Sequence, residues 1–269
     1  MASILAIANQ KGGVGKTTTA INLAAALGAL ERRVLLVDCD PQGNATRGVG
    51  LEASPPTLYE VLTGEALATG AVRPVGFPFL EAVPSGRDLV GVEVEFVDLE
   101  RWQYRLAAAL EPLESRYDVI VLDCPPSLGH LTLSALVAAD RLLVPLQCEY
   151  FALEGVSALM STMTRVRATW NPRLQLAGIL LTMFDERTNL AKEVEAETRR
   201  HFGGGVFTTV VPRNVRLAEA PSHGVSILEY DIKSRGAEAY LALAREMIAG
   251  GADVGELAGD AAARARERF

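Results

Sequence analysis

The sequence predicts an α/β protein with a doubly wound, mostly parallel sheet flanked by helices. Short apolar runs recur along the chain, and they are continuous rather than alternating, which is typical of strands buried on both faces. Stretches with helical periodicity separate them, and most runs end in Gly, Pro, Asp or Asn, where such a sheet places its ligand loops. The expected strands are Ile4–Ala8, Val34–Val37, Val119–Leu122, Leu142–Leu146, Ile179–Leu181 and Phe207–Val211.

Helical periodicity is clearest in four stretches between these strands: Thr17–Leu30, Leu99–Leu113, Leu153–Thr169 and Asn189–Phe202. Segment 48–97 is less regular and rich in Gly, Pro and Val, so we expect an excursion around a short strand near Phe79–Val83. Because there is no linker and no internal repeat, residues 1–249 are expected to form a single domain. The Gly/Ala-rich residues 250–269 are expected to be a flexible tail or a frayed helix.

Composition favours a soluble, cytoplasmic protein. Of the 269 residues, 49% are hydrophobic and 22% are charged, as in ordinary globular proteins. No apolar stretch approaches the ~18 residues of a membrane span, and the start lacks the pattern of a signal peptide. The three cysteines are widely spaced, which favours reduced thiols over disulfides or a zinc site. The net charge of −7 argues against a nucleic-acid coat protein, although residues 160–240 carry 11 Lys and Arg against 9 Asp and Glu.

The stretch QKGGVGKTTT contains the end of a phosphate-binding loop, Gly15-Lys16-Thr17. An expected strand precedes it and an expected helix follows, which makes a chance glycine-rich turn a poor alternative. Backbone N–H groups and the helix N-terminus would bind phosphate, and Lys16 would reach the β- and γ-phosphates. The hydroxyl of Thr17 suits Mg²⁺, and Thr18 suits the α-phosphate.

The loop departs from the usual pattern at its first position, where Gln10 replaces glycine and Lys11 follows. The departure does not damage the loop, because three glycines still let the backbone approach phosphate. The residues expected to cradle the nucleotide are Lys11, Gly12, Gly13, Val14, Gly15, Lys16, Thr17 and Thr18.

Acidic residues follow two other expected strands. Asp38 and Asp40 end the run VLLVDCD, and Asp123 ends the run VIVLD, which matches a Walker B strand. Carboxylates at this edge of the sheet can bind Mg²⁺ or orient an attacking water. For either acid of the first pair alone, a solvated Asx-Pro turn is a plausible alternative; for the pair beside a phosphate loop it is a poor one.

Six motifs stand in the order that characterises the ParA/Soj family, Walker-type ATPases that segregate bacterial chromosomes and plasmids. The chain resembles this family from about Ile4 to Glu246, and the motifs are specific to its chromosomal Soj-like branch. They are KGGVGKTT, DCDPQGNAT, DCPPSLG, PLQCEYFALEG, LTMFDERTNL and VPRNVRLAEAPSHG.

The resemblance implies roles for individual residues. Lys11 matches the signature lysine that reaches across a nucleotide-sandwich dimer to the phosphates of the partner subunit. Lys16 matches the loop lysine and Thr17 the Mg²⁺ ligand. Asp40 matches the switch acid needed for hydrolysis, and Asp123 the Walker B acid; both are expected at the metal.

Further roles are implied outside the phosphate loop. Pro212 and Asn214 match a loop that packs near the adenine, and Arg187 and Arg216 match basic positions implicated in DNA binding. From the residues alone, a plain solvated face is favoured for Arg187, and the resemblance reverses that preference. The main departure from the family pattern is Cys39, where relatives often have an aliphatic residue.

The resemblance therefore implies a cytoplasmic, nucleoid-associated ATPase that uses ATP and Mg²⁺. Its ATP-bound homodimer would bind double-stranded DNA without sequence preference, and a ParB-type partner would stimulate the hydrolysis that releases it. The cargo, a chromosome or a plasmid, stays open.

Three alternatives remain. A MinD-like membrane-cycling ATPase would end in a helix with bulky apolar residues, whereas this tail offers mostly alanine, so no stable membrane association is expected. A reductase resembling nitrogenase iron protein would bridge a cluster with cysteines, but Cys124 and Cys148 lack that context. A DNA-binding module without turnover is disfavoured by the presence of both Asp40 and Asp123.

Overall fold

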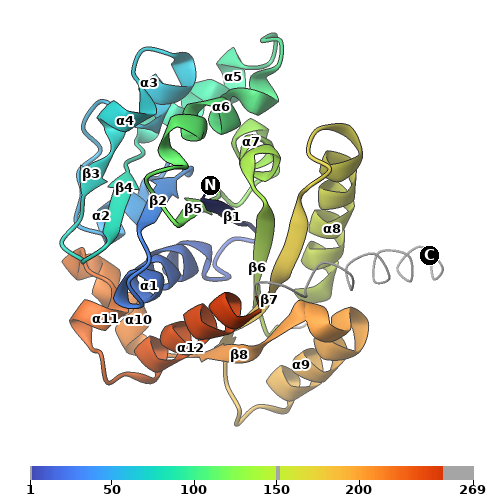
Figure 1. Ribbon diagram of the computed structural model, residues 1–269. Coiled ribbons are helices and arrows are strands. Elements are labelled where there is room, and N and C mark those ends of the chain that lie inside the picture. The colour runs from blue at the N-terminus through green and yellow to red at the C-terminus, as the bar shows by residue number, and fades with distance from the viewer. Residues whose placement is uncertain (1, 150–151, 251–269) are drawn as a thin grey trace.

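A single sheet runs through the molecule, with helices packed around it (Figure 1). The computed structural model describes residues 2–149 and 152–250, and within them eight strands stand in the order β3-β4-β2-β5-β1-β6-β7-β8. Neighbours are parallel except β3, which pairs antiparallel with β4 at one edge. The strands are β1 (Ser3–Ile7), β2 (Val34–Asp38), β3 (Arg73–Pro74), β4 (Leu80–Val83), β5 (Val119–Asp123), β6 (Arg141–Gln147), β7 (Gln175–Phe184) and β8 (Val206–Pro212).

The predicted fold class is confirmed. Each of the six apolar runs forms a strand, and β2 is buried along its whole length, as the continuous pattern requires. The strand expected near Phe79–Val83 is β4. Strand β3 was not predicted, because two residues are too short to show any periodicity.

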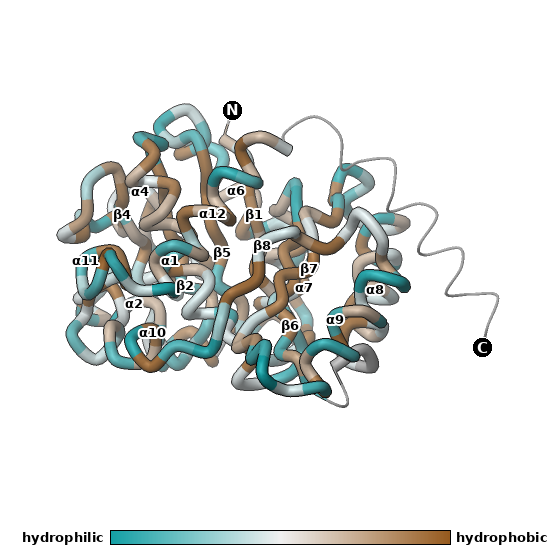
Figure 2. The backbone as a smooth tube through the Cα atoms, turned by 90° about the horizontal axis from the view of Figure 1, so that it is seen from below, coloured by the Kyte–Doolittle hydropathy of each residue, from teal (hydrophilic) through white to brown (hydrophobic). Residues whose placement is uncertain are grey.

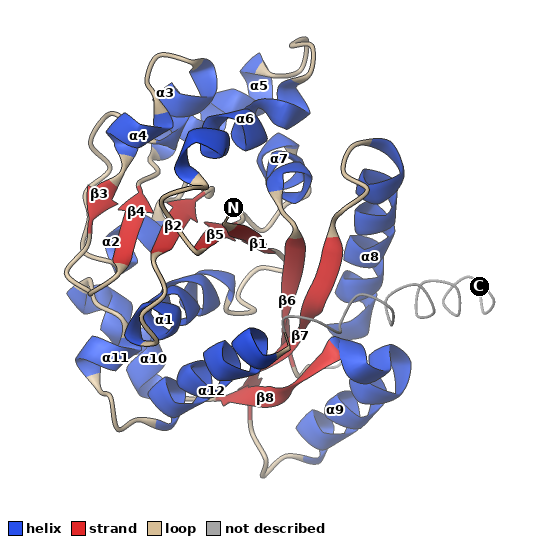
Figure 3. Ribbon diagram, viewed as in Figure 1, coloured by secondary structure: helices blue, strands red, loops and turns tan. Residues whose placement is uncertain are grey.

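Helices cover both faces of the sheet, as Figure 3 shows. Three of the four expected helices are present with nearly the predicted bounds, namely α1, α8 and α9. The full set is α1 (Lys16–Ala29), α2 (Asn44–Gly48), α3 (Leu58–Thr63), α4 (Ala68–Ala71), α5 (Val92–Glu95), α6 (Arg105–Leu110), α7 (His130–Ala138), α8 (Ala152–Thr169), α9 (Asn189–Phe202), α10 (Val215–Glu219), α11 (Ile227–Tyr230) and α12 (Arg235–Ala249).

The single long helix expected over Leu99–Leu113 is wrong. The segment consists of α6 between two short 3₁₀ helices, Trp102–Tyr104 and Glu111–Leu113. Arg101 stands before the first in a left-handed conformation with φ 59°, which no α-helix continues through. Pro112 lies in the second, where its ring disfavours regular helical hydrogen bonding.

Two apolar clusters fill the space between the sheet and its helices. One joins α1 and α12 to one face of β1 and β2, and the other joins α6, α7 and α8 to the opposite face. In Figure 2 the hydrophobic colour follows the strands, while the outer helices and loops are largely hydrophilic. Cys39 and Cys124 are buried in the second cluster, so Cys39 takes the place of an aliphatic side chain.

The carboxyl ends of β1, β2 and β5 meet at one edge of the sheet. Strand β5 lies between the other two, and its register aligns Ile7, Asp123 and Asp38. This edge is where a doubly wound sheet binds ligands. The domain boundary at residue 249 and the flexible tail stay predictions, because residues 251–269 lie outside the described part of the chain. Among the described helices, none is long and apolar enough to cross a membrane.

Candidate nucleotide-binding site

The loop between β1 and α1 has the backbone shape of a phosphate site. Gly13 and Gly15 have φ of 76° and 86°, which other residues adopt only with strain. Gly15 is the N-cap of α1, so the unpaired N–H groups of the first helical turn point out of the loop. A Cβ atom added at Gly12 or Gly13 would meet nothing within 4 Å. The concave side is therefore open, and its dipole and donors favour an anion.

Neighbouring strands hold this loop in place. The hydroxyl of Thr182 on β7 donates to the Val14 carbonyl at 2.9 Å. Asn9 is buried and donates to the Pro145 carbonyl at 2.7 Å, while its own oxygen accepts the Lys11 N–H at 3.0 Å. The predicted cradle is thus rigid before any ligand arrives. Sequence reasoning missed Thr182, because nothing local connects residue 182 to residue 14.

Lys16 points into the site rather than into solvent. Its side chain is buried, and its ammonium donates to the Lys11 carbonyl at 3.0 Å. Burial lowers the pKa of Lys16, while attraction to the Asp123 carboxylate opposes that shift. The structure therefore brings the predicted loop lysine next to the predicted Walker B acid.

The Lys11 side chain is partly exposed and is held by an acid outside the loop. Its ammonium pairs with Glu149, just after β6, at 2.8 Å, and both side chains are about half exposed. The other oxygen of Glu149 accepts the Gln147 side-chain N–H at 2.6 Å. The lysine that departs from the standard loop is thus held by an acid from a distant segment, which the sequence did not indicate.

Asp38 is a structural carboxylate. One oxygen accepts the Thr46 N–H at 2.8 Å and the Thr46 hydroxyl at 2.7 Å, and the other accepts the Asp40 N–H at 3.1 Å. Burial raises the pKa of Asp38 to about 6, and the hydrogen bonds from Thr46 oppose the rise. With its lone pairs committed, Asp38 shapes the turn that follows β2.

Asp123 has the opposite environment. It is fully buried, yet within the described residues neither carboxylate oxygen has a hydrogen-bond partner. Burial and repulsion from Asp38 raise its pKa, while the nearby Thr17 hydroxyl and Lys16 oppose the shift. A buried carboxylate without donors is costly unless a cation or a phosphate-bound metal completes it. The oxygen donors of Asp123 and Thr17 fit Mg²⁺.

Asp40 lies beside these groups on the turn after β2. One of its oxygens accepts the Gln42 N–H at 2.9 Å, and its carbonyl accepts the Ser85 hydroxyl at 2.8 Å. Ser85 follows β4, so the turn is tied to a second strand end. The predicted switch acid therefore has one carboxylate oxygen without a protein donor in the part of the chain described. That oxygen is available to water or metal.

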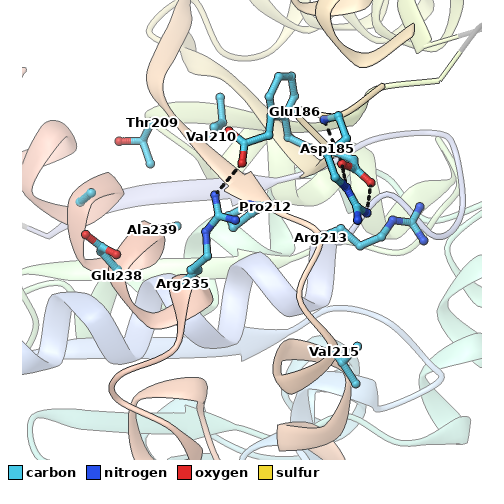
Figure 4. Close-up of a pocket in the computed structure, with 13 residues that line it drawn as sticks. Asp185, Glu186, Thr209, Val210, Pro212, Arg213, Val215, Arg235, Glu238 and Ala239 are labelled. Carbon is cyan, nitrogen blue, oxygen red and sulfur yellow. Dashed lines mark hydrogen bonds and ion pairs between the residues drawn. The ribbon is translucent and has the colours of Figure 1, made fainter. Parts of the chain in front are cut away.

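A groove of about 680 Å³ lies beyond the phosphate loop, between the ends of β7 and β8 and helix α12 (Figure 4). Three arginines line it: Arg187 in the turn after β7, Arg213 directly after β8, and Arg235 at the start of α12. Of these, only Arg187 was predicted. Arg187 forms a bidentate pair with Asp185 at 2.7 and 2.8 Å, which holds the Asp185 pKa well below its usual range. Arg235 lies 3.6 Å from Glu186, whereas Arg213 is exposed and makes no ion pair with any described residue.

The remaining predicted residues lie next to this groove. Pro212 lines it, and Asn214 caps α10 by accepting the Arg216 N–H at 2.8 Å. The Arg216 guanidinium pairs with Glu219 at 3.0 Å and lies 3.8 Å from Asp231. The fold thus brings Arg187, Pro212 and Arg216 to neighbouring turns. Arg213, which directly follows β8 in VPRNVR, is the additional cation that the motif itself contained.

Other metal chemistry finds no support in the described residues. No group of three or more His, Cys, Asp or Glu side chains there is placed to hold a metal ion. Cys124 and Cys148 are both buried, and burial raises the pKa of each thiol. Enclosed in this way, neither thiol is at a surface where it could bridge a cluster to a second subunit.

Known proteins resemble this chain along most of its length. Residues 2–176 match a family described as an AAA domain. The chain is 54% identical over 247 residues to the chromosome partitioning protein ParA of Myxococcus xanthus, covering 91% of this chain and 87% of that protein. It is 56% identical over 246 residues to the chromosome-partitioning ATPase Soj of Thermus thermophilus, covering 91% and 95%.

Solved structures resemble it along nearly the whole length. A cobyrinic acid a,c-diamide synthase of Mycobacterium smegmatis with bound ADP and magnesium superposes with a TM-score of 0.83 at 36% identity, covering 94% of this chain and 96% of that one. The cell division ATPase MinD of Pyrococcus furiosus superposes with a TM-score of 0.75 at 26% identity, covering 93% and 99%.

Proposed function

This chain belongs to the ParA/Soj family of chromosome-partitioning ATPases, and we propose that it is an ATP-switched, DNA-partitioning ATPase. As a member of this family it hydrolyses ATP. The observation that carries the proposal is the orphaned carboxylate of Asp123, which lies fully buried beside Lys16 and Thr17 at an open phosphate loop. Burying this carboxylate without a partner costs free energy, and a bound magnesium ion with a nucleotide would supply the missing partner.

The phosphates would bind in the loop of Gly12, Gly13, Val14 and Gly15, on the N-terminus of α1. Lys16 would donate to the β- and γ-phosphates, and Thr18 to the α-phosphate. Thr17 and Asp123 would hold Mg²⁺, with Asp40 nearby, and the ion would neutralise charge on the phosphates. Pro212 and Asn214 would lie near the adenine, since the end of β7 that contacts the loop also adjoins the groove.

Asp40 would orient the attacking water with its free oxygen. Its neighbour Asp38 keeps the turn in place through Thr46, so that carboxylate is committed to structure. Correct placement of a water in line with the γ-phosphate is the main task in such reactions, because catalysis there is largely positioning and charge stabilisation.

Two ATP-bound subunits would close face to face, with Lys11 of each reaching the phosphates of the other. Lys11 is partly exposed and pairs with Glu149 outside its own loop, and an accessible ammonium suits a role across an interface. A cation supplied in trans is worth ~10³–10⁵ in rate in related phosphoryl-transfer enzymes. Lys11 would therefore make hydrolysis depend on the presence of a partner.

The closed dimer would bind double-stranded DNA without reading its sequence, through Arg187 and Arg216 together with Arg213 and Arg235. Contacts from a few arginines are weak and salt-sensitive, and dimerisation doubles them. ATP binding would thus raise the affinity for DNA. Hydrolysis stimulated by a ParB-type partner would then release the DNA. The protein would act in the cytoplasm, on the nucleoid.

Gel filtration with ATP, with ADP and without nucleotide tests the dimer. Asp40→Ala is expected to form a dimer that persists with ATP, because binding is intact and hydrolysis is slow. Lys11→Ala is expected to bind nucleotide and stay monomeric. Normal ATP-dependent dimerisation of Lys11→Ala would refute the role across the interface.

Retention on arbitrary duplex DNA at low salt tests the basic face. Arg216→Ala is expected to keep ATP binding and dimerisation and to lose retention, because its guanidinium is exposed near the groove. Unchanged retention would show that DNA binds elsewhere.

A further inference from the structure

The segment between β4 and α6 exposes a row of valines. It folds as a 3₁₀ helix, Arg87–Gly91, that runs directly into α5. Val90, Val94 and Val97 are 60%, 76% and 61% exposed, and they lie on the outer side of this segment. The opposite side is buried in the core through Leu89, Val92 and Phe96. These three valines, here called the valine surface, are unpartnered in the described structure.

The charge around the valine surface has one sign. Residues 87–100 contain five acids, Asp88, Glu93, Glu95, Asp98 and Glu100, against a single basic residue, Arg87. Apart from Glu93 these acids are exposed. An apolar row with an acidic border is complementary to an amphipathic helix whose polar positions are Lys and Arg.

The same segment is bonded to both catalytic loops. At its start, the Ser85 hydroxyl donates to the Asp40 carbonyl at 2.8 Å. In its middle, Glu93 accepts the His130 N–H at 2.9 Å and the Leu131 N–H at 3.3 Å, at the N-terminus of α7. Helix α7 follows the loop after Asp123. A molecule bound to the valine surface would therefore contact a segment that positions the turn of Asp40 and the loop of Asp123.

We propose that the valine surface is the docking site for a basic amphipathic helix of a partner protein. A second copy of this chain is the poorer occupant, because contact of this surface with itself would oppose five acids to five. The inference deepens the proposed function, on which it rests, by locating where a stimulating partner binds. Because the segment of the valine surface is hydrogen-bonded to both catalytic loops, a partner bound there would change the rate of hydrolysis by shifting those loops.

Binding of a synthetic peptide to the full chain tests the proposal. The probe is a fluorescent peptide of about 20 residues with Leu at helical i, i+3, i+4, i+7 spacing and Lys or Arg elsewhere. A scrambled peptide of identical composition is its control. We expect the wild type to bind the patterned peptide about tenfold more tightly than the scrambled one, since only the former presents an apolar row.

Val94→Asp separates apolar contact from charge. The substitution adds a negative charge, so a purely electrostatic site would bind the basic peptide more tightly, whereas the proposal predicts a loss of about tenfold. Leu67→Asp, on a residue 79% exposed at the start of α4, is the matched control and should change nothing. Hydrogen exchange on the wild type gives an independent readout: the patterned peptide should slow exchange of the amides of residues 87–97.

Several outcomes would overturn the docking site: equal affinity for both peptides, unchanged binding by Val94→Asp, or unprotected amides at 87–97. Loss of the ATP-dependent dimer in Val94→Asp would instead assign the surface to a second copy and would also refute the proposal. The wild-type dimer and its retention on DNA are measured in the same series. Their absence would refute the proposed function, while the peptide affinities would still decide the docking site.

Discussion

Two regions of the described chain each contain one charged side chain with bonding partners and one without. They are the sheet edge formed by β1, β2 and β5 and the groove beside β7 and β8. At the edge, Asp38 and Asp123 are aligned on neighbouring strands, yet the Asp38 side chain accepts three hydrogen bonds while that of Asp123 accepts none from the described residues. In the groove, Arg187 is bonded to Asp185, whereas Arg213 makes no ion pair with a described residue and only adds a longer-range attraction to Asp185.

The presence or absence of a bonding partner distinguishes charged side chains that stabilise the fold from those that are available to bind a ligand. A partnered charge positions its own loop, as Asp38 does for Thr46. An unpartnered charge is costly when buried, by ~1–3 kcal/mol or more, and nearly free when exposed. Asp123 is therefore the strongest indication of a ligand in the molecule, and Arg213 a weaker one.

Lys16→Ala is expected to have the largest effect, because Lys16 shares the enclosed site of Asp123. Loss of a charge-assisted bond to phosphate costs ~1.5–3 kcal/mol, which corresponds to about 10–100-fold weaker ATP binding. Calorimetric titration with MgATP measures it, with the exposed Lys192→Ala as control. Wild-type affinity in Lys16→Ala would contradict the assignment of the loop.

Arg213→Ala and Arg187→Ala sharpen the comparison in the groove. Arg213 makes no ion pair with a described residue, so its removal should reduce the slope of log K against log salt by about 0.9 for each subunit, or about 1.8 for the dimer. Arg187 must first leave Asp185, so its removal should reduce the slope by clearly less. DNA affinity at several salt concentrations gives both slopes. Equal reductions would show that the Asp185 pair does not restrain Arg187.

Glu149→Gln has the smallest expected effect, because it breaks a half-exposed ion pair worth ~0–1 kcal/mol. Releasing Lys11 should strengthen the ATP-dependent dimer by at most about fivefold for each of its two subunits. Sedimentation in the Asp40→Ala background measures this dimer without turnover. Glu195→Gln, which breaks the surface pair with Arg199, is the control and should leave the dimer unchanged. A weaker dimer in Glu149→Gln would show that Glu149 helps rather than restrains Lys11.

The parts predicted well from sequence are those encoded by contiguous residues. The phosphate loop needs glycines and a lysine at fixed spacing between a strand and a helix, and all of these lie within Ser3–Ala29. The Walker B strand likewise ends in its own acid, Asp123.

Other features depend on contacts between distant residues and left no local pattern. The residue pattern alone does not show that Asp38 is structural, because its hydrogen bonds come from Thr46, which is itself held by Ser85. The groove unites residues from three elements, and Arg235 is 48 positions from Arg187. Helix α7 is almost wholly buried, so it lacks the amphipathic periodicity that would have predicted it. The helix expected over Leu99–Leu113 fails because the left-handed Arg101 and Pro112 interrupt a favourable apolar spacing.

Thermal unfolding of Asp38→Asn and Asp123→Asn, with and without MgATP, tests the central claim most directly. Asp38→Asn should lower the ligand-free Tm, because it disrupts buried hydrogen bonds worth ~1–3 kcal/mol, or about 2–4 °C for each kcal/mol. Asp123→Asn should leave the ligand-free Tm unchanged or raise it, and should abolish most of the rise that MgATP produces in the wild type. A ligand-free Asp123→Asn protein as destabilised as Asp38→Asn, with the full MgATP rise retained, would contradict the account.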